Sequence, residues 1–309
     1  MKKFIVIFLT IMGLFGLLAF SGCSPRNGPR KARTKTRFAL DTTVSITYYE
    51  AKDEETVSKA LDLVSEYEKI FSRTDKKSEL YRVNQSGTDG VLLSEDLRQI
   101  ISDASDINFI SEELFDITLG GVSALYDFSG EKRVPDENTL SEALSHTGME
   151  KILLSDDGRL TFSEAGIILD LGAIAKGYIA DKVKAFLESA GVKNALINLG
   201  GNVLALSDGD KEYAVGIQKP VQGSQEYVQV LKIRNEAVST SGTYERSFEK
   251  DGVFYHHILN PKTGRPFDTV KGYGLDVKSV TVIGQKSEIA DMLSTALFLS
   301  GPERGKGVI

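Results

Sequence analysis

Apolar residues recur every three to four positions in several parts of the chain, a spacing that predicts amphipathic helices. In one such stretch Val57, Leu61 and Val64 fall on a single helical face, and in another the pattern stops at Gly191, a residue typical of helix ends. Helices are predicted over residues 53–71, 94–112, 137–146, 174–190 and 287–299.

Other stretches are rich in β-branched and aromatic residues, which favour strands. Residues 38–50 predict one strand, and shorter strands are expected within 151–169 and 193–258, where Asp-Gly turns separate apolar runs. The predicted helices do not alternate regularly with the strands. The sequence therefore predicts the α+β class with a mixed, largely antiparallel sheet.

The N-terminus has the pattern of an export signal. Lys2 and Lys3 precede an apolar run that ends in "FSGC", and Cys23 is the only cysteine. Residues 1–23 are typical of a bacterial lipoprotein signal whose cysteine is lipidated, which predicts an exported protein held on the outer or periplasmic face of a membrane. An uncleaved anchor and a plain signal peptide are the alternatives. No disulfide can form within a chain that has one cysteine.

Residues 24–37 contain six Lys or Arg, no acid and almost no apolar side chain, so they predict a disordered basic tether before a domain at 38–309. Without the eight cations of residues 1–37, the stated 37 fall to 29, against 43 acids that all lie beyond residue 37, which leaves a net charge of −14. Such a domain is not expected to bind nucleic acid, whose phosphates require a basic face. An anionic ligand would need a local cation.

Two motifs could bind such a ligand. In "DLGAIAKG" Asp170 follows an apolar strand and precedes a helix, so it is either an N-cap or part of an anion site to which Lys176 contributes. In "SEIADMLSTALFL" Asp291 and Thr295 lie one helical turn apart. Asp291 either complements the helix dipole or, together with Thr295, supplies the hard oxygen ligands that Mg²⁺ prefers.

Glycine-rich and histidine-containing segments lie between these motifs. "NLGGN" and "TSGTYER" are compatible with simple turns or with a ligand-binding loop, and neither has the spacing of a dinucleotide fold or a P-loop. His256 and His257 point to opposite faces if they lie in a strand, so only one of them is expected to face a site.

Taken together, these segments resemble a known family. The chain contains, in order, "ALDTTVSI", "SELYRVN", "LFDITLGG", "DLGAIAKGYIAD", "INLGGN", "STSGTYERSF", "HHILNPKTGRP", "SVTVIG" and "ADMLSTALFLSG". Their order and spacing are similar to those of the ApbE family, the FAD:protein FMN transferases. Leu40 and Asp41 stand where the family usually has Met and Gly.

The resemblance implies a T-fold-like structure that uses FAD as substrate and Mg²⁺ as cofactor. It implies transfer of FMN from FAD to a Thr or Ser of a partner flavoprotein, with AMP released. By motif, the FAD site would contain Leu40, Leu114, Phe115, Asp116, Asp170, Lys176 and Leu259. The Mg²⁺ ligands would be the Ala173 carbonyl, Asp291 and Thr295, and His257 would be the general base.

Two other functions are compatible with the same residues. An exported FAD pyrophosphatase would use water in place of the protein hydroxyl and would release free FMN and AMP. A lipid-anchored flavin-binding protein would catalyse no reaction at all. Metal-dependent release of AMP distinguishes the binding protein from both enzymes.

Overall fold

The fold was taken from a computed structural model, which describes residues 31–128, 130–267 and 277–306. The predicted signal at 1–23 lies outside the described residues. The chain from Ala32 onward forms one compact unit. Among the described helices, none combines the length and the apolar character needed to cross a membrane.

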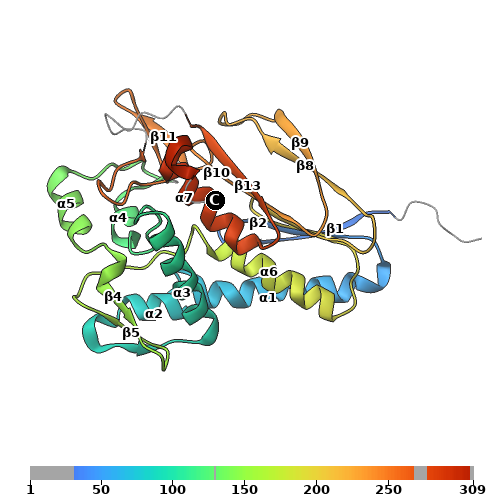
Figure 1. The fold of residues 1–309 in the computed structure, drawn as a ribbon, viewed down its shortest axis with the longest axis horizontal. Coiled ribbons are helices and arrows are strands. Elements are labelled where there is room, and N and C mark those ends of the chain that lie inside the picture. The colour runs from blue at the N-terminus through green and yellow to red at the C-terminus, as the bar shows by residue number, and fades with distance from the viewer. Residues whose placement is uncertain (1–30, 129, 268–276, 307–309) are drawn as a thin grey trace, which may run out of the picture. The chain divides into compact units, whose positions relative to one another are not determined.

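The unit is built on a six-stranded sheet in which every pair of neighbouring strands is antiparallel (Figure 1). In spatial order its strands are β1 (Arg33–Ala39), β2 (Thr42–Tyr48), β6 (Ala195–Leu199), β7 (Asn202–Leu206), β10 (Ala237–Gly242) and β13 (Ser279–Gly284). The strands that border the main core alternate buried and partly exposed residues, as in β2 and β6. Because side chains alternate between the two faces of a strand, the buried residues share one face of the sheet, and that face packs against helices.

Three long helices cover that face: α1 (Glu54–Phe71), α6 (Ala175–Ser189) and α7 (Ser287–Gly305), the last kinked at Gly301. Ile46 and Ile197 from the sheet and Val64 and Ile179 from the helices are fully buried in one shared core. Ala290 and Met292 of α7 belong to the same core. Because apolar burial is the main favourable term in folding, this core holds α6 against β6 and β7 and α7 against β10 and the edge strand β13.

The opposite face of the sheet is covered in part by a hairpin of β8 (Tyr213–Gln218) and β9 (Tyr227–Ile233). Tyr213, Val215 and Ile233 of the hairpin form a second core with Val203 and Val238 of the sheet. One face of the hairpin therefore packs its apolar side chains on the sheet, and its other face points away from the sheet.

The remaining elements lie beside these layers (Figure 1). They are α2 (Glu79–Asn84), β3 (Val91–Leu92), α3 (Glu95–Ile110), α4 (Gly120–Leu125), α5 (Glu137–Ser145), β4 (Ile152–Leu154), β5 (Arg159–Phe162), β11 (Ser247–Lys250) and β12 (Val253–His256). Short 3-10 helices occur at Ala51–Asp53, Gly87–Asp89 and Met149–Lys151. β3, β5 and β4 form a small sheet, and β11 pairs with β12.

The predicted α+β class is confirmed, and each predicted helix is present. Two predictions near the N-terminus are wrong. Residues 33–37, assigned to a disordered tether, form most of β1, so the domain includes three more cations and has a net charge of −11 instead of −14. Residues 38–50, predicted as one strand, contain the turn between β1 and β2, where Leu40 and Asp41 both have a φ of 55°.

Close contact between α6 and α7 depends on Gly177. A Cβ atom at this position would lie 2.5 Å from the Ser287 carbonyl oxygen and 2.7 Å from the Glu288 Cα atom, and both of these are backbone atoms of α7. Only a residue without a side chain allows this approach. The approach sets where α7 presents Asp291 relative to the start of α6.

We expect Gly177→Ala to lower the free energy of unfolding by about 1–3 kcal/mol, because the two helices must move apart. Chemical denaturation measures this change. Gly121→Ala is the matched control: Gly121 lies in α4 and its Cβ would make only an ordinary contact, 3.9 Å from Ile168. Equal stability of the two variants would contradict the packing argument.

Candidate active site

A cavity of about 970 Å³ opens at one end of the central sheet. It lies where the first turn of α6 and the first half of α7 meet the loops around α4 and β12. Its volume is at the upper end of the range found for small-molecule sites. All the residues predicted from the sequence line it: Leu40, Leu114, Phe115, Asp116, Asp170, Ala173, Lys176, His257, Leu259, Asp291 and Thr295. The structure thus brings together segments that span most of the folded chain.

Asp291 is a buried carboxylate, 5% exposed, in the second turn of α7. Its Oδ1 accepts a hydrogen bond from Ser239 Oγ at 2.7 Å, and its Oδ2 accepts one from the Gly177 amide at 2.9 Å. The Gly177 amide belongs to the first turn of α6, whose amides have no partner within their own helix. Among the described residues no Lys or Arg lies within ion-pair distance of Asp291.

A buried charge without a counter-ion is costly, so Asp291 is suited to a bound cation. Thr295 lies one turn further along α7, and its Oγ1 is 3.0 Å from Ser241 Oγ. Ala173 lies in the loop before α6 and lines the same cavity. A carboxylate, a hydroxyl and a backbone carbonyl are hard oxygen ligands, and this set fits Mg²⁺ with water or phosphate in the other positions.

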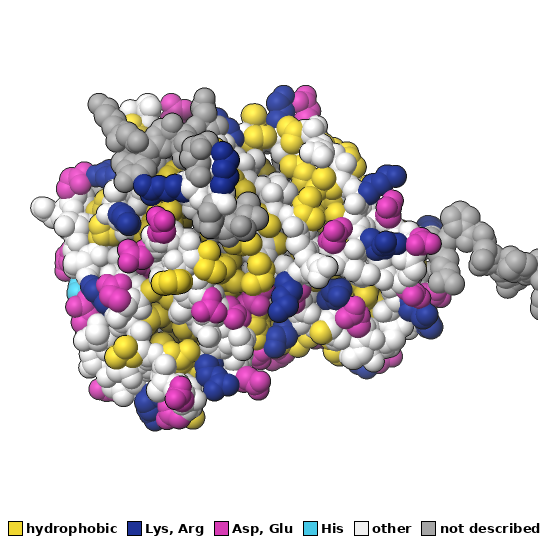
Figure 2. Space-filling view, in the orientation of Figure 1, with side chains coloured by type: hydrophobic (Ala, Val, Ile, Leu, Met, Phe, Trp, Pro, Cys, Tyr) yellow, Lys and Arg dark blue, Asp and Glu magenta, His cyan; other side chains and the backbone are white. Residues whose placement is uncertain are grey.

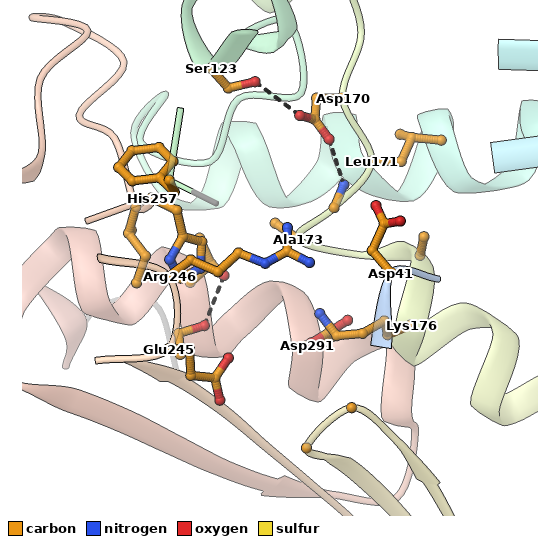
Figure 3. A pocket seen from close by; sticks show the side chains of 18 of the residues that line it. Asp41, Ser123, Asp170, Leu171, Ala173, Lys176, Glu245, Arg246, His257 and Asp291 are labelled. Atoms are coloured by element: carbon orange, nitrogen blue, oxygen red, sulfur yellow. Dashed lines mark hydrogen bonds between the residues drawn. The ribbon is translucent and has the colours of Figure 1, made fainter. Parts of the chain in front are cut away.

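Asp170 organises the loop that precedes α6. Its Oδ1 accepts a hydrogen bond from the Gly172 amide at 2.9 Å, and its Oδ2 accepts one from Ser123 Oγ at 3.0 Å (Figure 3). Oδ2 also lies 3.2 Å from Arg73 Nε. The alternative that Asp170 caps the helix is wrong, because α6 begins at Ala175 and no side chain caps it. Asp170 instead accepts a hydrogen bond from the Gly172 amide, which fixes the turn that precedes α6, and it holds the Arg73 guanidinium at the cavity.

Lys176 and Arg246 line the cavity and form no ion pair among the described residues, although the carboxylate of Glu245 lies near enough to interact with both. Lys176 is half-buried in the first turn of α6, and the Arg246 side chain runs across the cavity in Figure 3. Unpaired cations beside a helix N-terminus attract phosphate groups. Together they supply the local positive charge that an anionic ligand needs on this acidic domain.

His257 lines the cavity directly after β12, whereas His256 is fully buried and packs against Phe298 with ring centroids 5.9 Å apart. The prediction that only one of them faces a site therefore agrees with their positions. His257 Nδ1 is buried without a hydrogen-bond partner among the described residues. Burial and the nearby charges of Arg246, His256 and Lys176 lower the pKa of His257 to about 3, so its ring is neutral at physiological pH.

The predicted apolar residues form the walls of the cavity. Leu114, Phe115 and Leu259 are at most 6% exposed, so most of their surface packs into the protein and only their edges reach the cavity. Leu40 is half-buried at the turn between β1 and β2. Asp116 accepts hydrogen bonds from the Thr118 amide and hydroxyl at 2.7 and 2.6 Å, and burial raises the pKa of Asp116.

Sequence reasoning missed some of the cavity's charged residues as members of the site. Arg73 follows α1 and meets Asp170 only in the folded chain. Arg246 and Glu245 were noted as part of "TSGTYER" but were not assigned a role, and both line the cavity. For Arg73 the sequence holds no signal, because the partner lies in a distant segment.

If the cavity binds FAD, as the family resemblance implies, we expect Lys176→Ala to weaken that binding roughly tenfold to a hundredfold, the loss of one charge-assisted contact to phosphate. Thermal stability without ligand should change little, because Lys176 makes no ion pair with the described chain. Fluorescence titration with FAD measures the affinity. Lys184→Ala, on the same helix but paired with Glu188 at 3.0 Å, is the control, and equal affinity of the two variants would remove Lys176 from the site.

Comparison with known proteins places this chain in a family. The sequence model of the ApbE family matches residues 40–309. An FAD:protein FMN transferase from Klebsiella pneumoniae is 36% identical over 257 residues, covering 82% of this chain and 78% of the relative. One from Treponema pallidum is 33% identical, covering 88% and 79%.

Solved structures have the same fold. The flavin transferase ApbE from Vibrio cholerae matches with a TM-score of 0.79 and 29% identity, covering 91% of this chain and 90% of that one. The ApbE protein from Thermotoga maritima matches with a TM-score of 0.81 and 30% identity, covering 90% of each chain. The predicted family is therefore confirmed, and this chain belongs to the ApbE family.

Proposed function

We propose that this chain is an FAD:protein FMN transferase that uses Mg²⁺, joins FMN to a Thr or Ser of a partner flavoprotein and releases AMP. Membership of a family whose curated relatives bear that enzyme name supports the class of reaction. The observation that carries the proposal is the pairing, in one cavity, of a buried carboxylate without a counter-ion and two unpaired cations.

In this proposal Asp291, Thr295 and the Ala173 carbonyl hold the metal ion. When bound, Mg²⁺ offsets the charge of the pyrophosphate and stabilises the AMP that leaves. Lys176 and Arg246 would bind the phosphates, and Asp170, through Arg73 and the Gly172 amide, keeps the loop before α6 in place. Orienting a substrate in this way accounts for much of the catalysis of phosphoryl transfer.

The acceptor hydroxyl attacks the phosphorus atom of the FMN half. A new phosphodiester bond forms between that phosphorus and the Thr or Ser oxygen, the pyrophosphate bond breaks, and AMP leaves with the bridging oxygen. His257 takes the proton of the hydroxyl on a ring nitrogen. Because its ring is neutral at physiological pH, His257 has a lone pair available for that proton.

Incubation of the protein with FAD, Mg²⁺ and a flavoprotein domain tests the proposal, with mass spectrometry of the protein and nucleotide products. The expected result is a domain heavier by one FMN and an equal amount of AMP. Free FMN with AMP, and no labelled domain, would identify a pyrophosphatase. FAD recovered unchanged at every Mg²⁺ concentration would identify a binding protein.

We further propose that residues 1–23 direct export and that Cys23 is lipidated, which would hold the domain on the outer or periplasmic face of a membrane. This rests on the basic start, the apolar run and the cysteine position in the sequence. Cys23→Ser is expected to release the protein into the soluble exported fraction. Fractionation of cells measures this, and a variant that stays in the membrane with its leader intact would show that the leader itself is an anchor.

A further inference from the structure

The β8–β9 hairpin has apolar residues on both of its faces. Tyr213, Val215 and Ile233 point toward the central sheet and are buried there. On the outward face, Val228 and Val230 are 60% and 59% exposed. Strands that cover a sheet on one side normally present polar residues on the other. The outward apolar face therefore needs an explanation other than folding.

Tyr227 belongs to the same face. It is 65% exposed, and a Cβ atom on Gly216 would lie 2.5 Å from its ring, so the ring rests on the backbone of β8. The glycine lets the tyrosine lie flat beside Val230, which pairs with Gly216 across the hairpin. We call Tyr227, Val228 and Val230 the hairpin patch. Figure 2 shows hydrophobic side chains gathered over β8 and β9.

Charged residues of the hairpin are largely paired with one another. Lys219 lies 2.7 Å from Glu226, and Lys232 lies 3.8 Å from Glu212. The patch therefore has little net charge at its borders. It suits an apolar partner surface better than an anionic membrane or a nucleic acid, both of which require unpaired cations.

The hairpin patch is continuous with the candidate active site. The end of β8 and the connection to β9 contribute Gln218, Gln222 and Gly223 to the cavity wall, and Val221 in that connection is 52% exposed. A molecule seated on the patch would thus reach the cavity mouth with one end. Within the described chain β8 and β9 pair only with each other, so β9 also has a free edge that an extended segment could join.

We propose that the hairpin patch is the docking surface for the acceptor flavoprotein. This inference rests on the proposed transferase function, because only that function requires a protein to enter the cavity. The acceptor places an apolar surface on Tyr227, Val228 and Val230, and its Thr or Ser extends past Gln222 into the cavity. Contact with the hairpin patch, outside the cavity, would favour a folded acceptor over a short peptide, while the cavity itself binds FAD.

The test compares two double variants of the exported protein. Val228→Ser/Val230→Ser alters the patch, and Leu92→Ser/Leu153→Ser is the matched control, since these leucines are 62% and 61% exposed in β3 and β4 and do not line the cavity. The probes are a purified flavoprotein domain that the unaltered enzyme labels and a short synthetic peptide around its modified residue. KM is measured for each probe, along with FAD affinity and sedimentation.

We expect the patch variant to raise KM for the folded domain about tenfold or more, the effect of removing two apolar contacts at an interface. KM for the peptide and the affinity for FAD should not change, and the control should behave as the unaltered enzyme does. An unchanged KM for the folded domain would overturn the inference.

Sedimentation adds a second contrary outcome. If the patch variant converts a dimer into a monomer while its KM stays the same, the patch binds a second copy of the chain, and the inference is overturned. If the unaltered enzyme labels no protein, the proposed function itself fails, and this inference with it.

Discussion

Asp291→Ala is expected to abolish Mg²⁺-dependent AMP release from FAD, with a fall in rate of roughly a thousandfold or more, because metal ions contribute several kcal/mol of charge stabilisation in such reactions. Asp291 is the only carboxylate that we assign to the metal. In the proposed mechanism, its loss would also leave the phosphates of FAD facing an acidic protein without a compensating ion. We therefore expect weaker FAD binding as well as slower reaction.

The contacts of Asp291 allow its charge to be separated from its hydrogen bonds. Ser239→Ala removes the donor to Oδ1 and leaves the negative charge in place, so a modest fall in rate is expected. Thr295→Ala should also be mild, because water can replace a neutral hydroxyl in the coordination shell. AMP release across a Mg²⁺ titration measures all three variants. An Asp291→Ala enzyme with an unaltered rate and metal dependence would contradict both the metal site and the mechanism.

Much of the fold could be predicted from the sequence because its long helices obey a strict period. Helices such as α1 and α6 have an apolar face that must be buried, and their bounds agree with the predicted ranges within a few residues. The cavity could be anticipated only through the resemblance to a family. Periodicity assigned no residue to a shared site, because it contains no information about which distant segments meet.

The start of the domain was mispredicted for a physical reason. Residues 33–37 have the composition of a disordered segment, yet the cations of this edge strand find partners on α1: Arg37 lies 2.6 Å from Asp62, and Lys35 donates to Ser58 Oγ at 2.7 Å. Lys and Arg are common on edge strands, where they prevent pairing with other chains. Composition alone cannot distinguish such a strand from a tether.

The hairpin turn at residues 40 and 41 was missed because its conformation is unusual for its residues. Two consecutive positive φ angles are typical of a type I′ turn, which favours Asn and Gly. Leu40 is a rare occupant of this region, and its amide donates to Glu68 Oε1 at 2.8 Å, a contact with α1 that helps to hold the turn. A tertiary contact thus stabilises a turn that local sequence does not favour.

His257→Gln is expected to lower the rate of FMN transfer by about a hundredfold to ten-thousandfold, the usual contribution of a general base, with little change in FAD affinity. His146→Gln is the matched control. His146 lies at the end of α5, where its Nδ1 is 3.2 Å from Glu164, and it does not line the cavity. Transfer at an unaltered rate in the His257 variant would remove this residue from the chemistry.

The dependence of rate on pH distinguishes a buried base from an ordinary histidine. A group whose pKa is lowered to about 3 stays unprotonated at every pH above that value, so kcat/KM, which reports the free enzyme, should not fall between pH 8 and pH 5 through His257. The charges of Arg246 and Lys176 help to lower the pKa of His257, and bound phosphates would offset those charges and raise this pKa. The acidic limb of kcat should therefore appear at a higher pH than the acidic limb of kcat/KM. Parallel profiles of the unaltered enzyme and of His257→Gln measure both limbs. The opposite result would be an acidic limb of kcat/KM near pH 6.5 that disappears in His257→Gln. It would show that His257 titrates as an exposed histidine and can accept the proton without substrate binding.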